Sequence, residues 1–128
     1  MKPETGAFLA KSRELLDRAP ALLAQNFIDD AGRTAYLAGF HVAQALIFEK
    51  QGRSPKSHGG VQTLFAQLVK DEPAITQEIR AFLGRAYNLK AIADYETAPG
   101  SNVTVAQATE AIDKRFVAAV IALIPNVP

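Results

Sequence analysis

The sequence predicts an all-α protein, an antiparallel up-and-down bundle of about five helices. Apolar residues recur at helical spacing along the chain, and no segment alternates in the manner of a strand. The apolar stretches are separated by glycine, proline and asparagine, which mark turns. The chain has 128 residues, of which 48% are hydrophobic and 21% are charged. This is ordinary globular composition, so we expect residues 1–128 to form a single domain.

The first two predicted helices meet at Asn26. Residues 3–25 carry a helical apolar pattern, and Pro20 inside it predicts a kink or a break. Asn26 is followed by two aspartates, a pattern typical of an N-cap with acids in the first turn. The second helix is therefore expected to begin there and to end near Gly52. Its small residues predict close approach of a neighbouring helix; they are Ala35, Ala38, Gly39, Ala43 and Ala45.

Two further helices are predicted in the middle of the chain. Residues 59–70 show one apolar stripe, and the sequence DEP ends it. Pro73 suits the first turn of the next helix, which we expect to span residues 73–96.

The last predicted helix follows a loop at residues 97–102. Thr104 and Gln107 have the spacing of a capping box, and the apolar series after them continues to Leu123. The second and last helices are apolar beyond one stripe, which predicts either a central position in the bundle or the interface of a homodimer. The extra apolar residues are Ile47, Phe48, Val117, Ile121 and Ile124.

Composition excludes several classes of function. The net charge of +1 gives no global basic field of the kind a dedicated duplex-binding protein has. The absence of cysteine excludes disulfides, thiolate metal sites and a cysteine nucleophile. No apolar run approaches the roughly 18 residues of a membrane span. We expect a cytoplasmic protein without a membrane partner, a metal or a cofactor.

Three segments resemble the HEPN family of small helical-bundle proteins. RTAYLAGFHVAQALIFEKQGRSPKSHGGVQTLF, residues 33–65, is similar to the family's AYYAxFxAAxALL helix and the PKTHxG-like loop after it. LGRAYNLKAIADYE, residues 83–96, is similar to the Arg-x-x-ADY ending of a later helix in one branch. QNFIDDAGRTAY, residues 25–36, resembles the entry between the first two helices. The resemblance implies an up-and-down bundle, commonly a homodimer, often encoded beside a minimal nucleotidyltransferase.

The resemblance also implies where a nuclease site would lie. HEPN ribonucleases work without metal and carry Arg, four to six residues, then His near the start of a late helix, in a site shared across the dimer. In one branch, a Tyr two residues after that His receives AMP from the nucleotidyltransferase. Here Lys90 stands for the Arg and Tyr95 falls where the His would be. An Arg-x4-His occurs instead in the earlier loop, from Arg53 to His58, and this displacement counts against ribonuclease activity.

The first candidate site is the cationic loop that contains Arg53, Lys56, Ser57 and His58. RNA cleavage without metal needs a base for the 2′-hydroxyl and a cation for the phosphorane. His58 is the candidate base, and Arg53 or Lys56 would supply the charge. The free amides of the next helix and the two following glycines would favour phosphate binding without catalysis. The plainest alternative is a solvated loop in which Ser57 and His58 cap that helix.

The second candidate group is Lys90, Asp94 and Tyr95. Lys90 and Asp94 are spaced i, i+4, so they share a helical face and are expected to pair. The pairing would hold Lys90 protonated and makes it a weak acid–base catalyst. Tyr95 is a candidate for modification or for stacking on a base. The alternative is a surface ion pair with a tyrosine packed near the end of the bundle.

His41 is expected to be a hydrogen-bonded core or interface residue. It lies five residues from Tyr36 on the same helix, so the two side chains should not face each other. Two histidines without a spacing such as HExxH give no case for a metal site.

Three hypotheses for function follow. The first is a non-catalytic component that binds nucleotide or RNA within a two-gene, toxin–antitoxin type module with a nucleotidyltransferase partner. The second is a metal-independent RNase toxin, with Arg53 as the phosphate clamp and His58 as the base. The third is a structural dimeric adaptor without a ligand. The sequence leaves open whether the protein is an enzyme.

Overall fold

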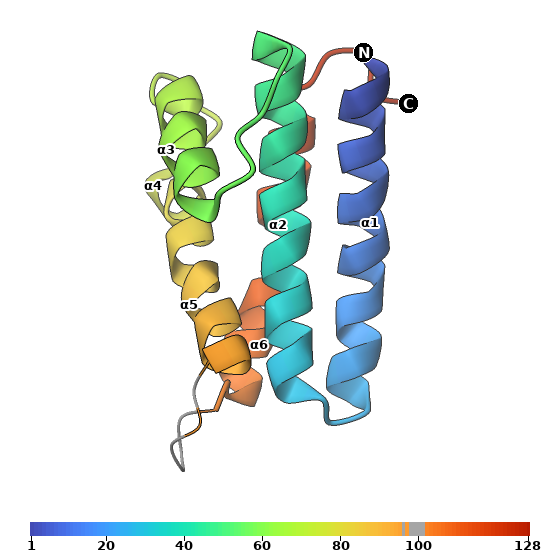
Figure 1. The fold of residues 1–128 in the computed structure, drawn as a ribbon, viewed down its shortest axis with the longest axis vertical. Coiled ribbons are helices and arrows are strands. Elements are labelled where there is room, and N and C mark those ends of the chain that lie inside the picture. Colours follow the sequence, from blue (N-terminus) through green and yellow to red (C-terminus); the bar gives the residue numbers. More distant parts are fainter. Residues whose placement is uncertain (96, 98–101) are drawn as a thin grey trace.

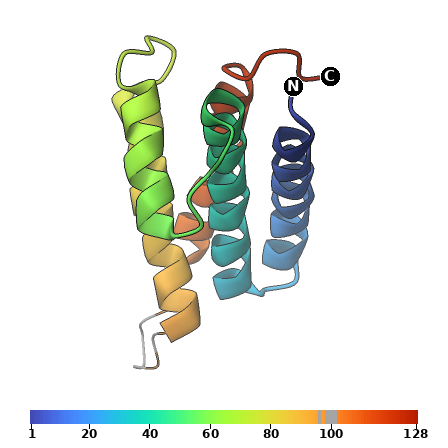
Figure 2. The same cartoon turned by 45° about the horizontal axis from the view of Figure 1, so that its top comes forward.

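The computed structural model describes residues 1–95, 97 and 102–128, and this part of the chain folds into helices joined by turns. α4 and α5 follow one another in one direction, as do α6 and α7, so the helices form five arms (Figure 1). The four long arms alternate in direction, and α3 runs parallel to α2 because the loop after α2 returns along that helix (Figures 1 and 2). The predicted all-α bundle is confirmed. The helices are α1 (Pro3–Ala24), α2 (Ile28–Gln51), α3 (His58–Val69), α4 (Gln77–Arg80), α5 (Phe82–Tyr95), α6 (Val105–Ile112) and α7 (Arg115–Ile121).

The turn between α1 and α2 differs from the prediction. α1 continues through Pro20 without the predicted break. Asn26 does not cap α2, because its backbone is left-handed, with a φ of 67°. Its amide donates to the Leu23 carbonyl at 3.0 Å, and the Phe27 amide donates to the Leu22 carbonyl at 2.9 Å. These two bonds are those of a Schellman motif, so Asn26 ends α1 instead of starting α2.

α2 is the central helix and contacts α1, α3, α5, α6 and α7. Its glycines allow these helices to approach closely, as the small residues predicted. A Cβ added at Gly39 would lie 2.7 Å from Cε1 of Phe82, and one at Gly32 would lie 3.1 Å from Cγ1 of Val103. The approach of α5 to α2 therefore depends on Gly39. α2 ends at Gly52, as predicted, with a φ of 77°.

The segment predicted as one helix over residues 73–96 is divided. Ile75 is buried and Thr76 is extended, and the Thr76 hydroxyl caps α4 by accepting from the Ile79 amide at 3.2 Å. Pro73 consequently lies in the turn before α4, outside any helix. α4 and α5 are separated at Ala81. The predicted end at residue 96 and most of the predicted loop at 97–102 lie outside the described residues.

The last arm begins as predicted and then divides. The Thr104 hydroxyl accepts from the Gln107 amide at 3.1 Å, and the Gln107 side chain accepts from the Thr104 amide at 2.9 Å, so the capping box is confirmed. The predicted continuous helix is wrong at Asp113, whose ψ of 128° ends α6. The Asp113 carboxylate accepts from the backbone amide of Arg115 at 2.9 Å. This local bond offers the backbone an alternative to the helix.

The core forms two clusters along α2. The larger contains Tyr36, Phe40, Phe65 and Phe116 with their aliphatic neighbours. The smaller lies between the first half of α2 and α6 and includes Leu89. Among the described helices, none has the length and apolar character to cross a bilayer.

Candidate functional site

The loop before α3 is held in place by hydrogen bonds to α2 and to α3 itself. The Gln44 side chain, only 6% exposed, donates to the Pro55 carbonyl at 3.2 Å. The Ser57 hydroxyl accepts from the Gly60 amide at 3.0 Å, so the predicted cap by Ser57 is confirmed. A Cβ at Gly60 would lie 2.7 Å from that hydroxyl oxygen and 2.9 Å from Cβ of Pro55. Gly60 thus makes room for the cap, which requires no ligand.

His58, the first residue of α3, turns its ring inward against α2 and does not cap the helix. Its Nδ1 lies 2.7 Å from the Tyr36 hydroxyl of α2. Its ring centroid is 4.7 Å from that of Phe40 and 5.2 Å from that of Tyr87 on α5. Tyr36 and Tyr87 also contact each other, at 5.6 Å and nearly edge to face. We call Tyr36, Phe40, His58 and Tyr87 the His58 cluster.

Burial controls the protonation states in the His58 cluster. It raises the pKa of Tyr36 to about 12, against a smaller opposite effect of the Gln62 side chain. Tyr36 therefore stays a phenol at neutral pH. Burial also lowers the pKa of His58, and the charge of Lys90 on α5 lowers it further, while Asp94 acts in the opposite direction. The imidazole is consequently neutral at pH 7.

The second predicted group adjoins the His58 cluster through Lys90. Lys90 Nζ lies 2.6 Å from Oδ2 of Asp94, so the predicted pair forms. The hydrogen bond to Asp94 is the main cause of a raised pKa of Lys90, which remains a cation, as expected. Arg33 of α2 approaches the other carboxylate oxygen, with Nε 3.0 Å from Oδ1. Tyr95, at the end of α5, is exposed, and Lys90 Nζ lies 5.4 Å from its ring centroid.

Arg53 and Lys56 stand apart from these contacts. Both side chains are exposed, and within the described residues neither makes a hydrogen bond to another side chain or an ion pair. The structure thus brings the His58 ring against Tyr87 of α5, one turn before Lys90 on the same helix. The two cations nearest to His58 in sequence extend into solvent.

Sequence reasoning missed Arg33, Tyr36 and Tyr87 as members of this site. One signal was present on α5, where Tyr87, Lys90 and Asp94 follow at intervals of three and four residues and so share a helical face. Tyr36 gave no local signal, because its partner His58 is 22 residues away across the loop.

His41 has the structural role that the sequence predicted. Its Nδ1 lies 2.8 Å from Oε1 of Gln44, the residue that anchors the loop, and its ring stacks on Phe8 of α1 with centroids 6.4 Å apart. Burial lowers the pKa of His41. Among the described residues, no group of three or more histidines or carboxylates is placed to hold a metal ion.

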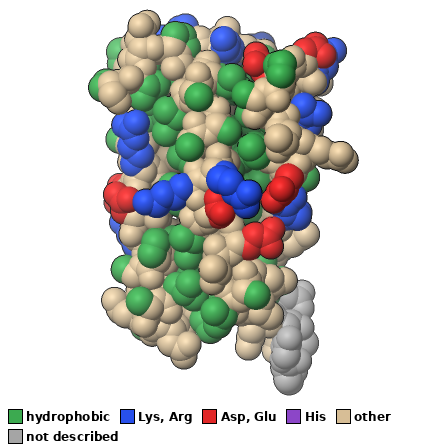
Figure 3. Space-filling model, turned by 180° about the vertical axis from the view of Figure 1, so that it is seen from behind, with side chains coloured by type: hydrophobic (Ala, Val, Ile, Leu, Met, Phe, Trp, Pro, Cys, Tyr) green, Lys and Arg blue, Asp and Glu red, His purple; other side chains and the backbone are tan. Residues whose placement is uncertain are grey.

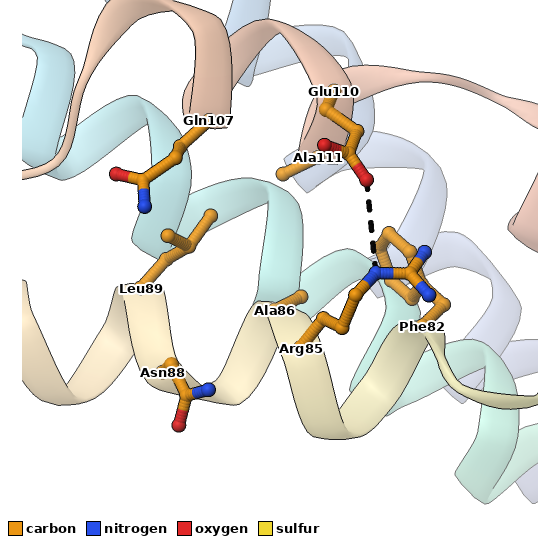
Figure 4. A pocket seen from close by; sticks show the side chains of 8 residues that line it. All are labelled: Phe82, Arg85, Ala86, Asn88, Leu89, Gln107, Glu110 and Ala111. Atoms are coloured by element: carbon orange, nitrogen blue, oxygen red, sulfur yellow. Dashed lines mark ion pairs between the residues drawn. The ribbon is translucent and has the colours of Figure 1, made fainter.

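The hollows of the described surface include one of about 530 Å³ between the start of α2 and the end of α5, lined by Asp29, Asp30 and Ala93. A groove of about 260 Å³ between α5 and α6 has Phe82, Ala86 and Leu89 on one side and Ala111 on the other (Figure 4). A second hollow of about 310 Å³ continues it toward α4 and α7. Arg85 Nε and Glu110 Oε1 lie 3.6 Å apart at the groove. No residue of the His58 cluster lines these hollows.

The side opposite to the view of Figure 1 carries charges of both signs. Figure 3 shows lysine, arginine and acidic side chains side by side in a band across it, between patches of hydrophobic side chains. No histidine is visible among the described residues drawn on this face. This mixed surface lacks the single-sign field that attracts nucleic acid.

Comparison with known proteins identifies relatives. The HEPN domain family matches residues 5–123. A Methanocaldococcus jannaschii protein named "Putative toxin MJ0605" is 33% identical over 97 residues, which are 76% of this chain and 72% of that protein. A second protein of the same organism, "Putative toxin MJ0142", is 28% identical over 95 residues, which are 74% of this chain and 64% of that protein.

Proposed function

This chain belongs to the HEPN domain family, and on that premise we propose that it is the HEPN component of a two-gene toxin–antitoxin module. In this proposal residues 1–128 form one cytoplasmic domain that acts as a homodimer beside a nucleotidyltransferase partner. It binds the phosphate of nucleotide or RNA and does not cleave it. The names of the two relatives support the toxin–antitoxin context.

The observation that carries the non-catalytic role is the hydrogen bond between Tyr36 and His58. With a pKa of about 12, the phenol is protonated, and we assign its O–H as the donor to Nδ1 of the neutral imidazole in the 2.7 Å hydrogen bond. The proton of that imidazole is then on Nε2. In this tautomer the second ring nitrogen is a hydrogen-bond donor, which suits an anion and does not suit the abstraction of a 2′-hydroxyl proton.

Lys90 supports the same role. Its ammonium is held as a cation by Asp94, so it contributes charge and donors and no basic lone pair. A neutral donor beside a fixed cation is an arrangement that binds phosphate.

Purified protein tests the binding role directly. We expect AMP to raise the melting temperature and single-stranded RNA to remain intact in the presence of EDTA. His58→Ala should abolish the AMP effect, whereas His41→Ala, which changes the other half-buried histidine, should retain it. RNA cleavage that His58→Ala removes would overturn the proposal in favour of the RNase. Absence of both cleavage and the AMP effect would overturn it in favour of the adaptor.

Expression in cells tests the module. We expect the chain alone to slow growth and the nucleotidyltransferase encoded beside it to relieve the effect. The two proteins should also purify together. Normal growth combined with no association between the two proteins would contradict the toxin–antitoxin role.

A further inference from the structure

Asp94 is shared by two cations from different helices. Its two oxygens lie 2.6 Å from Lys90 Nζ and 3.0 Å from Arg33 Nε. Asp94 is 25% exposed, Lys90 14% and Arg33 41%. Within this group of three described residues, two positive charges face one carboxylate, and all three side chains reach the surface.

The Arg33 guanidinium retains donors that the protein does not use. Its Nε lies 3.0 Å from the Asp94 carboxylate, and the side chain is 41% exposed. Among the described residues this Nε is buried without a hydrogen-bond partner. Arginine carries five N–H groups in a planar fork that matches the oxygens of a phosphate. Arg33 can therefore contact a phosphate while Asp94 holds its position.

Tyr95 adds an exposed aromatic ring beside these charges. It is 70% exposed, the largest fraction among the exposed large hydrophobic side chains. Lys90 Nζ lies 5.4 Å from the centre of its ring. Proteins that bind single-stranded nucleic acid combine cations along the backbone with exposed aromatic rings on which bases stack.

The separation between the two ends of this surface exceeds one nucleotide. Tyr87 of the His58 cluster and Tyr95 are eight residues apart on α5, which is about 12 Å along the helix axis. A mononucleotide would fill only one end. A strand would extend from His58 past Lys90 to Tyr95.

We infer that Arg33, Lys90 and Tyr95 form a binding surface for single-stranded nucleic acid, with a phosphate on the solvent side of the Arg33 guanidinium and a base on the tyrosine ring. This inference rests on the proposed function, which it extends from phosphate contact at His58 to an extended single strand.

Fluorescence anisotropy with a labelled oligouridine tests the inference. Tyr95→Ala should weaken binding by about tenfold, because one stacked base contributes about 1–3 kcal/mol. Tyr95→Phe keeps the ring and should bind like the unchanged protein. Arg33→Gln should weaken binding and lower the slope of log affinity against log salt by about one. Arg18→Gln, which changes an arginine paired with Glu14 on α1, is the matched control and should have no effect.

The outcomes separate the inference from the proposed function. If the protein binds the oligonucleotide tightly and only His58→Ala removes binding, while Tyr95→Ala and Arg33→Gln leave it unchanged, the inference is overturned. The proposed function is kept in that case. An oligouridine duplexed with oligoadenine that binds as tightly as the single strand would also overturn the inference. Loss of all oligonucleotide and AMP binding in the unchanged protein would overturn both.

Discussion

The two sides of α5 differ: one has the polar contacts expected of a functional site, and the other has a groove. The side toward α2 and α3 holds His58, Tyr36 and Lys90, with a 2.7 Å hydrogen bond and perturbed pKa values. The side toward α6 has a groove of about 260 Å³, but its ion pair, Arg85 with Glu110, is exposed and 3.6 Å long. Enclosed small-molecule sites are concave. The polar contacts of the candidate site lie on the side of α5 away from this groove, which accords with the proposal of a ligand that lies along the surface.

The largest expected effect comes from Gly39, which sets the distance of α5 from α2 and so shapes both sides. A Cβ there would lie 2.7 Å from the Phe82 ring, and that ring cannot turn aside because it stacks on Phe116 with centroids 4.5 Å apart. Gly39→Leu should lower the free energy of unfolding by about 2–3 kcal/mol through overpacking. Urea denaturation measures the change.

Gly84, on the exposed face of α5, provides the control for this prediction. A Cβ there meets no atom within 4 Å. Gly84→Ala should raise the free energy of unfolding by up to about 1 kcal/mol, because alanine loses less backbone entropy in a helix. If Gly39→Leu were tolerated equally well, close approach to α2 would not be what positions α5.

A smaller effect distinguishes the two sides directly. Tyr36→Phe removes the hydroxyl that binds His58 and should cost about 1–2 kcal/mol, because the half-buried Nδ1 loses its partner. Arg85→Met removes the ion pair on the groove side and should change stability by no more than about 0.5 kcal/mol, since exposed pairs contribute little. Thermal denaturation of the two variants gives the comparison. If Arg85→Met lowered the stability more than Tyr36→Phe, the polar contact that stabilises the fold would lie on the groove side of α5.

The fold followed from the sequence where the signals were local. Helical spacing gave the bundle, and Thr104 with Gln107 gave a true capping box. Local reasoning failed where two local structures compete: Asn26 is suited both to capping the next helix and to ending the previous one, and its left-handed backbone completes the Schellman motif. Pro73 likewise suits a helix start or a turn, and burial of Ile75 decides for the turn.

The candidate site was predictable only in part, because its contacts are long-range. Lys90 with Asp94 was evident from i, i+4 spacing. The contact of Tyr36 with His58 depends on the loop after α2 folding back along that helix, which is decided by tertiary packing. Arg33 reaches Asp94 only because α2 and α5 are neighbours in the bundle.

The last and smallest expected effect is on the titration of His58. Lys90 lowers the pKa of His58 and Asp94 raises it, so Lys90→Met should raise that pKa and Asp94→Asn should lower it, as followed by the His58 ring protons in NMR. Lys56→Met, two residues from His58 in sequence, is the control and should leave the pKa of His58 unchanged.

The same shift makes stability depend on pH. The pKa of His58 in the folded protein lies below the value of roughly 6.5 for an unfolded chain. The neutral histidine therefore supports stability above that pH, and this support is lost as pH falls through the folded pKa. Lys90→Met should therefore lessen the acid-induced loss of stability. If the pKa of His58 changed in Lys56→Met and not in Lys90→Met, α5 would have no influence on His58. The two predicted groups would then be independent sites.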